Sequence, residues 1–191
     1  MTRIVAGTAG GRRLKVPSQG TRPTSDRVRE ALFSALESRG ELRDARVLDL
    51  YAGSGALGLE ALSRGAAEAL FVEVDRKAAV VLKANIAGVR LGGSVRVGAV
   101  ETVLAKERPE EPFDVVFADP PYAHDSARLS VMLTALAAGG WIAERGLVVI
   151  ERAGRDGEPD WPGGFEPLRV MRHGDTAVFW AEFVTSQGHG A

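Results

Sequence analysis

From Arg46 onward, short apolar runs alternate with segments whose apolar residues have helical spacing. The apolar runs are Val47 to Tyr51, Ala69 to Val74, Ser94 to Val97, Phe113 to Ala118 and Leu147 to Glu151. The helical segments between them are Ala56 to Ser63, Arg76 to Ile86, Val100 to Lys106 and Ala127 to Ala137. This alternation predicts an α/β fold in which helices cover both faces of a mostly parallel sheet.

Both ends of the chain depart from this alternation. Near the end, Pro167 to Arg172 and Ala177 to Val184 flank the Gly174-Asp175 turn. That pattern predicts an antiparallel hairpin at the edge of the sheet, which brings the expected number of strands to seven. At the start, two short apolar-alternating pieces between Arg3 and Val16 predict a small β-hairpin that is too short to fold alone.

A helix is predicted between this N-terminal hairpin and the first long strand. Thr24 or Ser25 can cap its start, Val28 to Leu36 carries the helical spacing, and Gly40 can end it. A chain of 191 residues is typical of one domain of this class. We expect a basic N-terminal extension over residues 1–22, a core over 23–184 and a flexible tail over 185–191.

The chain contains no cysteine. This excludes disulfides, thiolate metal sites and a thiol nucleophile. No stretch is long and apolar enough for a membrane helix, and the first residues do not resemble a secretion signal, which predicts a cytoplasmic protein.

Charge is distributed unevenly although the net charge is only −1. Residues 1–30 contain seven basic and two acidic residues, and the remainder is acidic. The basic residues that we consider for nucleic-acid binding are Arg12, Arg13, Lys15, Arg22, Arg27 and Arg29. A basic patch of this kind fits a polyanion such as RNA or DNA, although a solvated basic face would give the same pattern.

A Gly-x-Gly-x-x-Gly motif formed by Gly53, Gly55 and Gly58 lies between a predicted strand and a predicted helix. Such a turn lets the backbone approach a ligand closely, and the helix start offers free N–H groups. Glu73 follows twenty residues after Gly53, where a carboxylate can accept ribose hydroxyls. The motif by itself also fits a dinucleotide, and Glu73 could instead cap the next helix, as Asp75 could.

Asp49 lies beneath this turn, two residues before the expected strand end. A carboxylate there would repel a pyrophosphate but attract the cationic methionine end of S-adenosylmethionine. The alternative is that Asp49 only braces the glycine turn through backbone N–H groups. The position favours a sulfonium cofactor over a dinucleotide without deciding between them.

The segment Asp119-Pro120-Pro121-Tyr122 follows the buried run Phe113 to Ala118. Ligands of open α/β sheets bind at the carboxyl ends of the strands, so Asp119 is expected to face the cofactor. An exocyclic amino group on a base is a poor nucleophile, because its lone pair is delocalised into the ring. Asp119 and the Pro120 carbonyl can accept its protons and stabilise the positive charge that develops, while Tyr122 can stack on the unstacked base. A purely structural turn is the alternative.

Three segments resemble the RsmD family, bacterial methyltransferases that act on the N2 amino group of a guanine in 16S ribosomal RNA. They are Arg22 to Phe33, Leu48 to Ala66, and Asp119 to Tyr122. The resemblance spans residues 3 to about 182 and implies a Rossmann-like class I S-adenosylmethionine-dependent methyltransferase fold.

The resemblance also implies roles for individual residues. Gly53, Gly55 and Glu73 would contact the cofactor, Asp119 and Tyr122 would meet the guanine, and Arg22 to Arg29 would help to hold RNA. The implied partner is the 30S subunit or an assembly intermediate, with guanine 966 as the target. Many methyltransferases place an acidic or amide side chain after the third strand. Here that position reads Gly98-Ala99-Val100-Glu101, so we expect the backbone of Ala99 and Val100 to contact adenine.

The remaining candidate residues give weaker signals. We expect His124 to be a solvated loop residue, although it could touch substrate, and the Gly174-Asp175-Thr176 turn has no clear role in a site. The histidines lack metal-ligand spacing, so we expect no metal. Trp141, Trp161 and Trp180 are expected to pack in the core or at its edge.

Three other functions compete with methylation of a guanine amino group. A DNA methyltransferase acting on adenine N6 or cytosine N4 would use the same turn, although no separate target-recognition domain is evident. A nucleotide-dependent oxidoreductase would share the glycine motif but leave the Asp119 turn unexplained. A non-catalytic RNA-binding factor could use the basic end alone. Methylation at cytosine C5 is disfavoured by the absence of cysteine. A small domain with one basic edge predicts a monomer.

Overall fold

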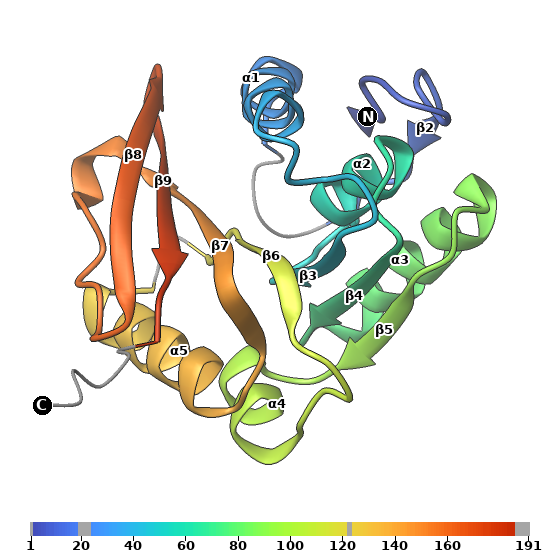
Figure 1. Cartoon of the computed structure of the whole chain (residues 1–191). Helices are drawn as coiled ribbons and strands as arrows, with labels where there is room; N and C mark the ends of the chain where they lie inside the picture. Colours follow the sequence, from blue (N-terminus) through green and yellow to red (C-terminus); the bar gives the residue numbers. More distant parts are fainter. Residues whose placement is uncertain (1, 19–23, 122–123, 186–191) are drawn as a thin grey trace, which may run out of the picture.

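The computed structural model describes residues 2–18, 24–121 and 124–185, and its centre is a seven-stranded sheet (Figure 1). In spatial order the strands are β5 (Ser94–Val97), β4 (Glu68–Glu73), β3 (Arg46–Leu50), β6 (Phe113–Ala118), β7 (Ile142–Ala153), β9 (Thr176–Phe183) and β8 (Phe165–His173). The first five are parallel, while β9 is antiparallel to both β7 and β8. The predicted seven-stranded sheet with an antiparallel edge hairpin is therefore confirmed.

Helices cover both faces of the sheet (Figure 1). They are α1 (Asp26–Ser38), α2 (Ala56–Ser63), α3 (Arg76–Val89), α4 (Val100–Lys106) and α5 (Ser126–Ala138), with a 3-10 turn η1 (Gly154–Asp156) after β7. Leu59 of α2 and Leu82 of α3 are buried in one core, as is Phe33 of α1. Val103 of α4 and Leu133 of α5 are buried in the core on the opposite face. None of the helices within the described ranges is long and apolar enough to cross a membrane.

Strand β7 begins five residues earlier than the apolar run predicts. It starts at Ile142, whose partner on β6 is Phe113, and the register shifts before Val115 pairs with Leu147. Arg145 lies within this stretch and has a left-handed backbone, with φ of 65°. Because the irregular stretch is polar and exposed, it does not show the apolar pattern of a buried strand.

The N-terminal segment forms the predicted hairpin, with β1 (Thr2–Arg3) antiparallel to β2 (Arg13–Leu14). Polar groups of α2 hold it in place. The Glu60 carboxylate accepts hydrogen bonds from the N–H groups of Val5 and Ala6 over 2.8 and 3.0 Å. Ile4 and Leu14 are buried in the same core as α1 and α2. The hairpin thus has few residues of its own and depends on α2 for both polar and apolar contacts.

Helix α1 and the C-terminal hairpin also agree with the sequence. The Ser25 side chain accepts a hydrogen bond from the Val28 N–H over 3.2 Å, which caps the start of α1. Residues Gly174 and Asp175 form the turn between β8 and β9. Trp141 and Trp180 are buried as predicted, and Trp161 packs at the edge of the core.

Candidate active site

A cavity of about 350 Å³ lies at the carboxyl ends of the parallel strands. This is the size of a small-ligand site. Six of the predicted site residues line it: Asp49, Gly53, Glu73, Ala99, Val100 and Asp119. Two others, Gly55 and Pro120, are not part of the lining. Tyr122 lies outside the described residues.

The position of Asp49 is compatible with both alternatives, bracing the glycine turn and facing a ligand in the cavity. Its carboxylate accepts a hydrogen bond from the Gly58 N–H over 2.9 Å, which braces the start of α2, and it also lines the cavity. Burial raises the pKa of Asp49 to about 8; the Gly58 hydrogen bond acts against this rise and the charge of Glu73 adds to it. A buried carboxyl of this kind gains free energy when a cation binds beside it.

The glycines fit the turn for steric reasons. Gly55 precedes α2 with φ of 84°, a conformation that side chains rarely adopt, and a Cβ there would lie 2.4 Å from Leu82 Cδ1. A Cβ on Gly58 would lie 2.4 Å from Phe71 Cε1. Gly55 therefore shapes the turn through close packing, while Gly53 lines the cavity.

Glu73 stabilises the glycine turn from the end of β4. Its carboxylate accepts hydrogen bonds from the Gly53 N–H over 2.7 Å and from the Asp75 N–H over 2.9 Å. The cap of α3 is Asp75, whose side chain accepts from the Ala78 N–H over 2.9 Å. The helix-capping alternative for Glu73 is therefore wrong, and its carboxylate remains at the cavity wall with lone pairs for a ligand hydroxyl.

Asp119 follows β6, where its neighbours come from β7 and from the segment before α1. In the parallel pairing, Ala118 lies opposite Ile150, so Asp119 and Glu151 come next on the two strands. Burial raises the pKa of Asp119 well above its usual range, and the charges of Glu151 and Asp49 raise it further. The Thr24 hydroxyl donates a hydrogen bond to Glu151 and also borders the cavity.

His124 corrects the expectation of a solvated loop residue. It lines the cavity, and its ring meets the Tyr51 ring edge to face, with centroids 5.3 Å apart. Its Nδ1 atom is buried and has no hydrogen-bond partner among the described residues. Burial lowers the pKa of His124, and the nearby charge of Arg128 lowers it further. This position lies in no periodic pattern of the sequence, because the histidine follows the Asp119 turn.

Tyr51 and Glu101 form a polar pair beside the predicted adenine position. The Tyr51 hydroxyl donates a hydrogen bond to Glu101 Oε1 over 3.1 Å, and both residues line the cavity with Ala99 and Val100. The Glu101 carboxylate thus lies next to the backbone of Ala99 and Val100, although Glu101 is not one of the predicted cofactor contacts.

Comparisons with known proteins identify the family of this chain. A family model described as "Conserved hypothetical protein 95" matches residues 2–182. The ribosomal RNA small subunit methyltransferase D of Escherichia coli K12 is 39% identical over 176 residues, which cover 92% of this chain and 86% of that protein. The chain belongs to the RsmD family.

Solved structures support the RsmD assignment at the level of the fold. The putative methyltransferase yhhF from Escherichia coli superposes with a TM-score of 0.85 at 38% identity, covering 96% of this chain and 98% of that one. A magnesium protoporphyrin IX methyltransferase from Synechocystis, solved with bound SAM, shares the fold with a TM-score of 0.64 at 14% identity, covering 86% of each chain.

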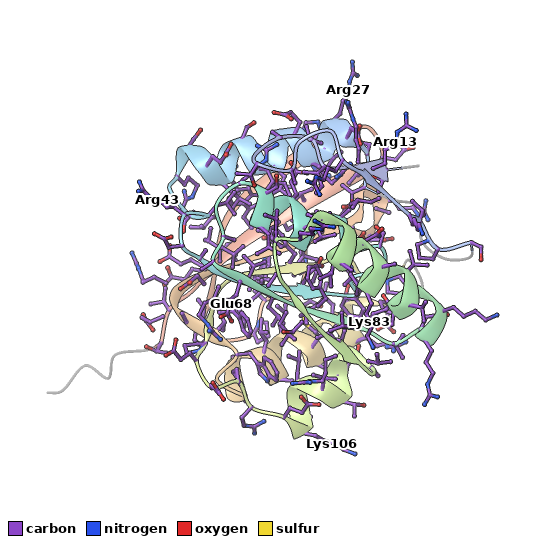
Figure 2. All side chains as sticks on the ribbon, turned by 90° about the vertical axis from the view of Figure 1, so that its right-hand side faces the viewer. Arg13, Arg27, Arg43, Glu68, Lys83 and Lys106 are labelled. Carbon is purple, nitrogen blue, oxygen red and sulfur yellow. The ribbon has the colours of Figure 1, made fainter. Side chains whose placement is uncertain are left out.

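The basic residues of this RsmD-family chain occupy different environments. Arg13, Lys15 and Arg27 are exposed, and Figure 2 shows Arg13 and Arg27 both projecting outward at the top of the molecule in that view. Arg12 is exposed but donates hydrogen bonds to the Gly88 and Val89 carbonyls over 2.8 and 3.3 Å, near the end of α3. Arg22 lies outside the described residues. Arg12, Arg13 and Lys15 line a second cavity against α3.

Arg29 is wrong as a predicted RNA contact, because its side chain is 0% exposed. The guanidinium donates to the Arg3 carbonyl over 2.6 Å and to the Asp26 carboxylate over 2.5 Å, and lies 3.6 Å from Glu60. Glu60 in turn pairs with Arg64 over 2.9 Å. Arg29 therefore connects β1 to α1 and α2 and presents no charge to a nucleic acid.

Asn85 of α3 links the basic segment to the glycine turn, a role that its sequence context did not predict. Its Oδ1 accepts from the Lys15 N–H over 2.9 Å, and its Nδ2 donates to the Lys15 carbonyl over 2.9 Å and the Ser54 carbonyl over 2.8 Å. Val16 and Pro17, which follow Lys15, line the main cavity. The N-terminal segment thus forms part of the active-site wall.

No group of three or more His, Cys, Asp or Glu side chains in the described part of the chain is arranged to hold a metal ion.

Proposed function

We propose that this protein transfers a methyl group from S-adenosylmethionine to the exocyclic N2 amino group of a guanine in 16S ribosomal RNA. The single observation that carries the proposal is the position of Asp119, which lines the same cavity as the glycine turn. Membership of the RsmD family supports ribosomal RNA as the substrate, since the Escherichia coli relative is named a ribosomal RNA small subunit methyltransferase. Guanine 966 and the 30S particle follow from the family resemblance.

The residues around the glycine turn fit S-adenosylmethionine. Asp49 and Glu73 put two carboxyl groups at the cavity wall. A sulfonium or an ammonium is favoured there because it stabilises the ionised form of Asp49, whereas a pyrophosphate would oppose that form. Glu73 can accept ribose hydroxyls, and Ala99 and Val100 offer the backbone beside the adenine. When bound, the cofactor supplies an electrophilic methyl group.

Asp119 and the Pro120 carbonyl would act on the amino group of the base. By accepting its two protons they localise the nitrogen lone pair and stabilise the positive charge that forms during attack. The cofactor would supply the methyl group, with the electron pair of the broken S–C bond left on sulfur as the new N–C bond forms. One proton then leaves the nitrogen through Asp119 to solvent, which restores a neutral amine.

The basic side chains would position the RNA backbone. Arg13, Lys15 and Arg27 are exposed and carry no sequence information, because phosphate contacts are the same for every base. Lys15 directly precedes Val16 and Pro17, and these two residues line the cavity. The target base would reach Asp119 only after leaving its stack.

Labelled S-adenosylmethionine offered with four acceptors tests the proposal: naked 16S RNA, 30S subunits that lack the modification, duplex DNA and no nucleic acid. We expect label at guanine N2 of ribosomal RNA, and labelling about 10²- to 10³-fold slower after Asp119→Ala. Transfer to DNA alone would contradict the proposal, and a non-catalytic binder would bind RNA equally well with or without Asp119. Tight binding of NAD in place of S-adenosylmethionine would indicate an oxidoreductase.

A further inference from the structure

Glu151 lies at the carboxyl end of β7, next to the proposed catalytic carboxylate. Strands β6 and β7 are parallel, and the pairing of Ala118 with Ile150 places Asp119 and Glu151 one step further along each strand. The charge of Glu151 contributes to the raised pKa of Asp119, as expected for neighbouring carboxyl groups. Glu151 itself is not part of the cavity lining. Its hydrogen-bond partner Thr24 does line the cavity, so the Glu151 carboxylate lies one side chain away from it.

Glu151 is held in position by Thr24, whose hydroxyl donates a hydrogen bond to its Oε2 atom. Within residues 2–18, 24–121 and 124–185, no Lys, Arg or His side chain forms an ion pair with Asp119 or Glu151. Burial raises the pKa of Glu151 as well. In their ionised form, two neighbouring carboxylates without a cation make a site with an excess of acceptors, and donors from a ligand would stabilise that form.

The bases differ in the donors that they can bring to such a site. The Watson–Crick edge of guanine presents the N1–H beside the N2 amino group, so neighbouring positions both donate. Adenine and cytosine place a ring nitrogen acceptor beside their amino group, and that lone pair would face a second carboxylate. A site with one carboxylate can serve any of the three amino groups, whereas two neighbouring acceptors match guanine.

We propose that Glu151 accepts the N1–H of the target guanine while Asp119 accepts from its N2 amino group, so that Glu151 selects guanine over adenine and cytosine. This inference rests on the proposed function and assigns its base specificity to one residue. Thr24 is a positioning residue in this scheme, because its hydroxyl hydrogen-bonds the Glu151 carboxylate, and it also lowers the pKa of Asp119 through a hydrogen bond.

The test compares two target bases in otherwise identical RNA, guanine and 2-aminopurine. Both carry the N2 amino group, but N1 of 2-aminopurine has no hydrogen and is an acceptor. Each RNA is prepared by ligation and assembled into 30S particles, and kcat/KM is measured for both. We expect the wild type to prefer guanine roughly 10- to 100-fold. In Glu151→Gln the amide can donate to N1 of 2-aminopurine, so this preference should shrink at least about tenfold.

Two further variants keep the experiment decisive. Thr24→Val removes the hydroxyl that interacts with both Glu151 and Asp119, so kcat/KM should fall for both bases. The preference should shrink in the same direction as in Glu151→Gln but by less, and this ratio replaces that of Glu151→Gln if that variant does not fold. Glu144→Gln changes an exposed glutamate at the other end of β7 and should leave the preference unchanged. Thermal unfolding and the S-adenosylmethionine affinity report whether each variant is intact.

The outcomes separate the inference from the function on which it rests. If Glu151→Gln lowers kcat/KM equally for both bases, or for neither, the assignment of Glu151 is wrong while N2 methylation stands. If the wild type labels no guanine N2, the proposed function fails. A change in the ratio of kcat/KM for guanine to that for 2-aminopurine supports both the role of Glu151 and the proposed function. Intrinsic differences in the reactivity of the two bases cancel when this ratio is compared between wild type and variant.

Discussion

Charged and titratable side chains gather in two largely buried regions of this molecule, and only one of the two regions contains charges of both signs. The ion network between α1 and α2 consists of Asp26, Arg29, Glu60 and Arg64, and each carboxylate in it lies against a guanidinium. The strand-end carboxylates Asp49, Asp119 and Glu151 have raised pKa values and only neutral hydrogen-bond donors.

This difference separates buried charged groups that stabilise the fold from those that are available to a ligand. Removing a charge from water is unfavourable unless partners compensate it. The ion network contains its partners, so it stabilises one arrangement of the N-terminal hairpin and the helices. The strand-end carboxylates lack charged partners, and a ligand would have to supply the positive charge or further hydrogen-bond donors. Perturbed carboxyl groups in a cavity are typical of functional sites.

The largest effect should come from breaking the ion network. Glu60→Ala leaves two buried guanidiniums with fewer partners and removes the acceptor for the Val5 and Ala6 N–H groups. We expect a loss of about 3–5 kcal/mol in the free energy of unfolding, measured by urea denaturation. Glu60→Gln keeps one acceptor oxygen and should lose less. A loss below about 1 kcal/mol would show that the network is not a stabilising element.

Asp119→Ala should show the opposite balance, with lost activity and retained stability. Loss of one group that stabilises developing charge lowers kcat by about 10²- to 10³-fold. The melting temperature should stay the same or rise, because the substitution removes repulsion from Glu151 and Asp49. Asp119→Asn, which keeps an acceptor oxygen, should retain more activity. A large fall in melting temperature would mean that Asp119 is structural.

Asp49 should make cofactor binding depend on pH. Its pKa of about 8 in the free protein means that the carboxyl is largely protonated at neutral pH. A bound cation favours the ionised form, so binding releases a proton and the affinity rises with pH, by up to about tenfold per unit. Calorimetry between pH 5.5 and 7 measures this slope. Asp49→Asn should bind more weakly and without the slope, and an unchanged slope in that variant would contradict the assignment.

The smallest effect concerns the exposed arginines, which belong to neither region. Arg13→Ala combined with Arg27→Ala should weaken RNA binding a few-fold and reduce the salt dependence of the affinity by a slope of about 1 per residue. Filter binding at several salt concentrations measures it. Arg43, which Figure 2 shows at a distance from both, provides the control. Equal effects of Arg43→Ala would indicate nonspecific attraction.

The sheet, the glycine turn and the position of Asp119 could be predicted because each depends on local patterns. Apolar runs mark buried strands, and the carboxyl ends of parallel strands meet at one edge. The early start of β7 was missed because the strand is irregular around Arg145. The chemical roles of Asp49, Glu73 and Asp119 stay predictions.

Contacts distant in sequence account for the errors. Arg29 was expected at the surface because helical spacing shows which positions share a face but not what lies opposite them; its partner Glu60 is in another helix. Glu151 ended an apolar run and carried no signal until β6 was placed beside it. His124 and Asn85 likewise gained their roles from neighbours that only the fold brings near.

Asn85 also joins the segment proposed to bind RNA to the turn proposed to bind the cofactor. Its amide joins the backbone of Lys15 to that of Ser54, so a shift of the basic segment is transmitted to the turn that would hold the cofactor. Thermodynamic reciprocity then applies: whatever factor RNA adds to the cofactor's affinity, the cofactor adds to the affinity for RNA. A substitution at this one uncharged side chain in α3 is therefore expected to change how strongly the two affinities are coupled.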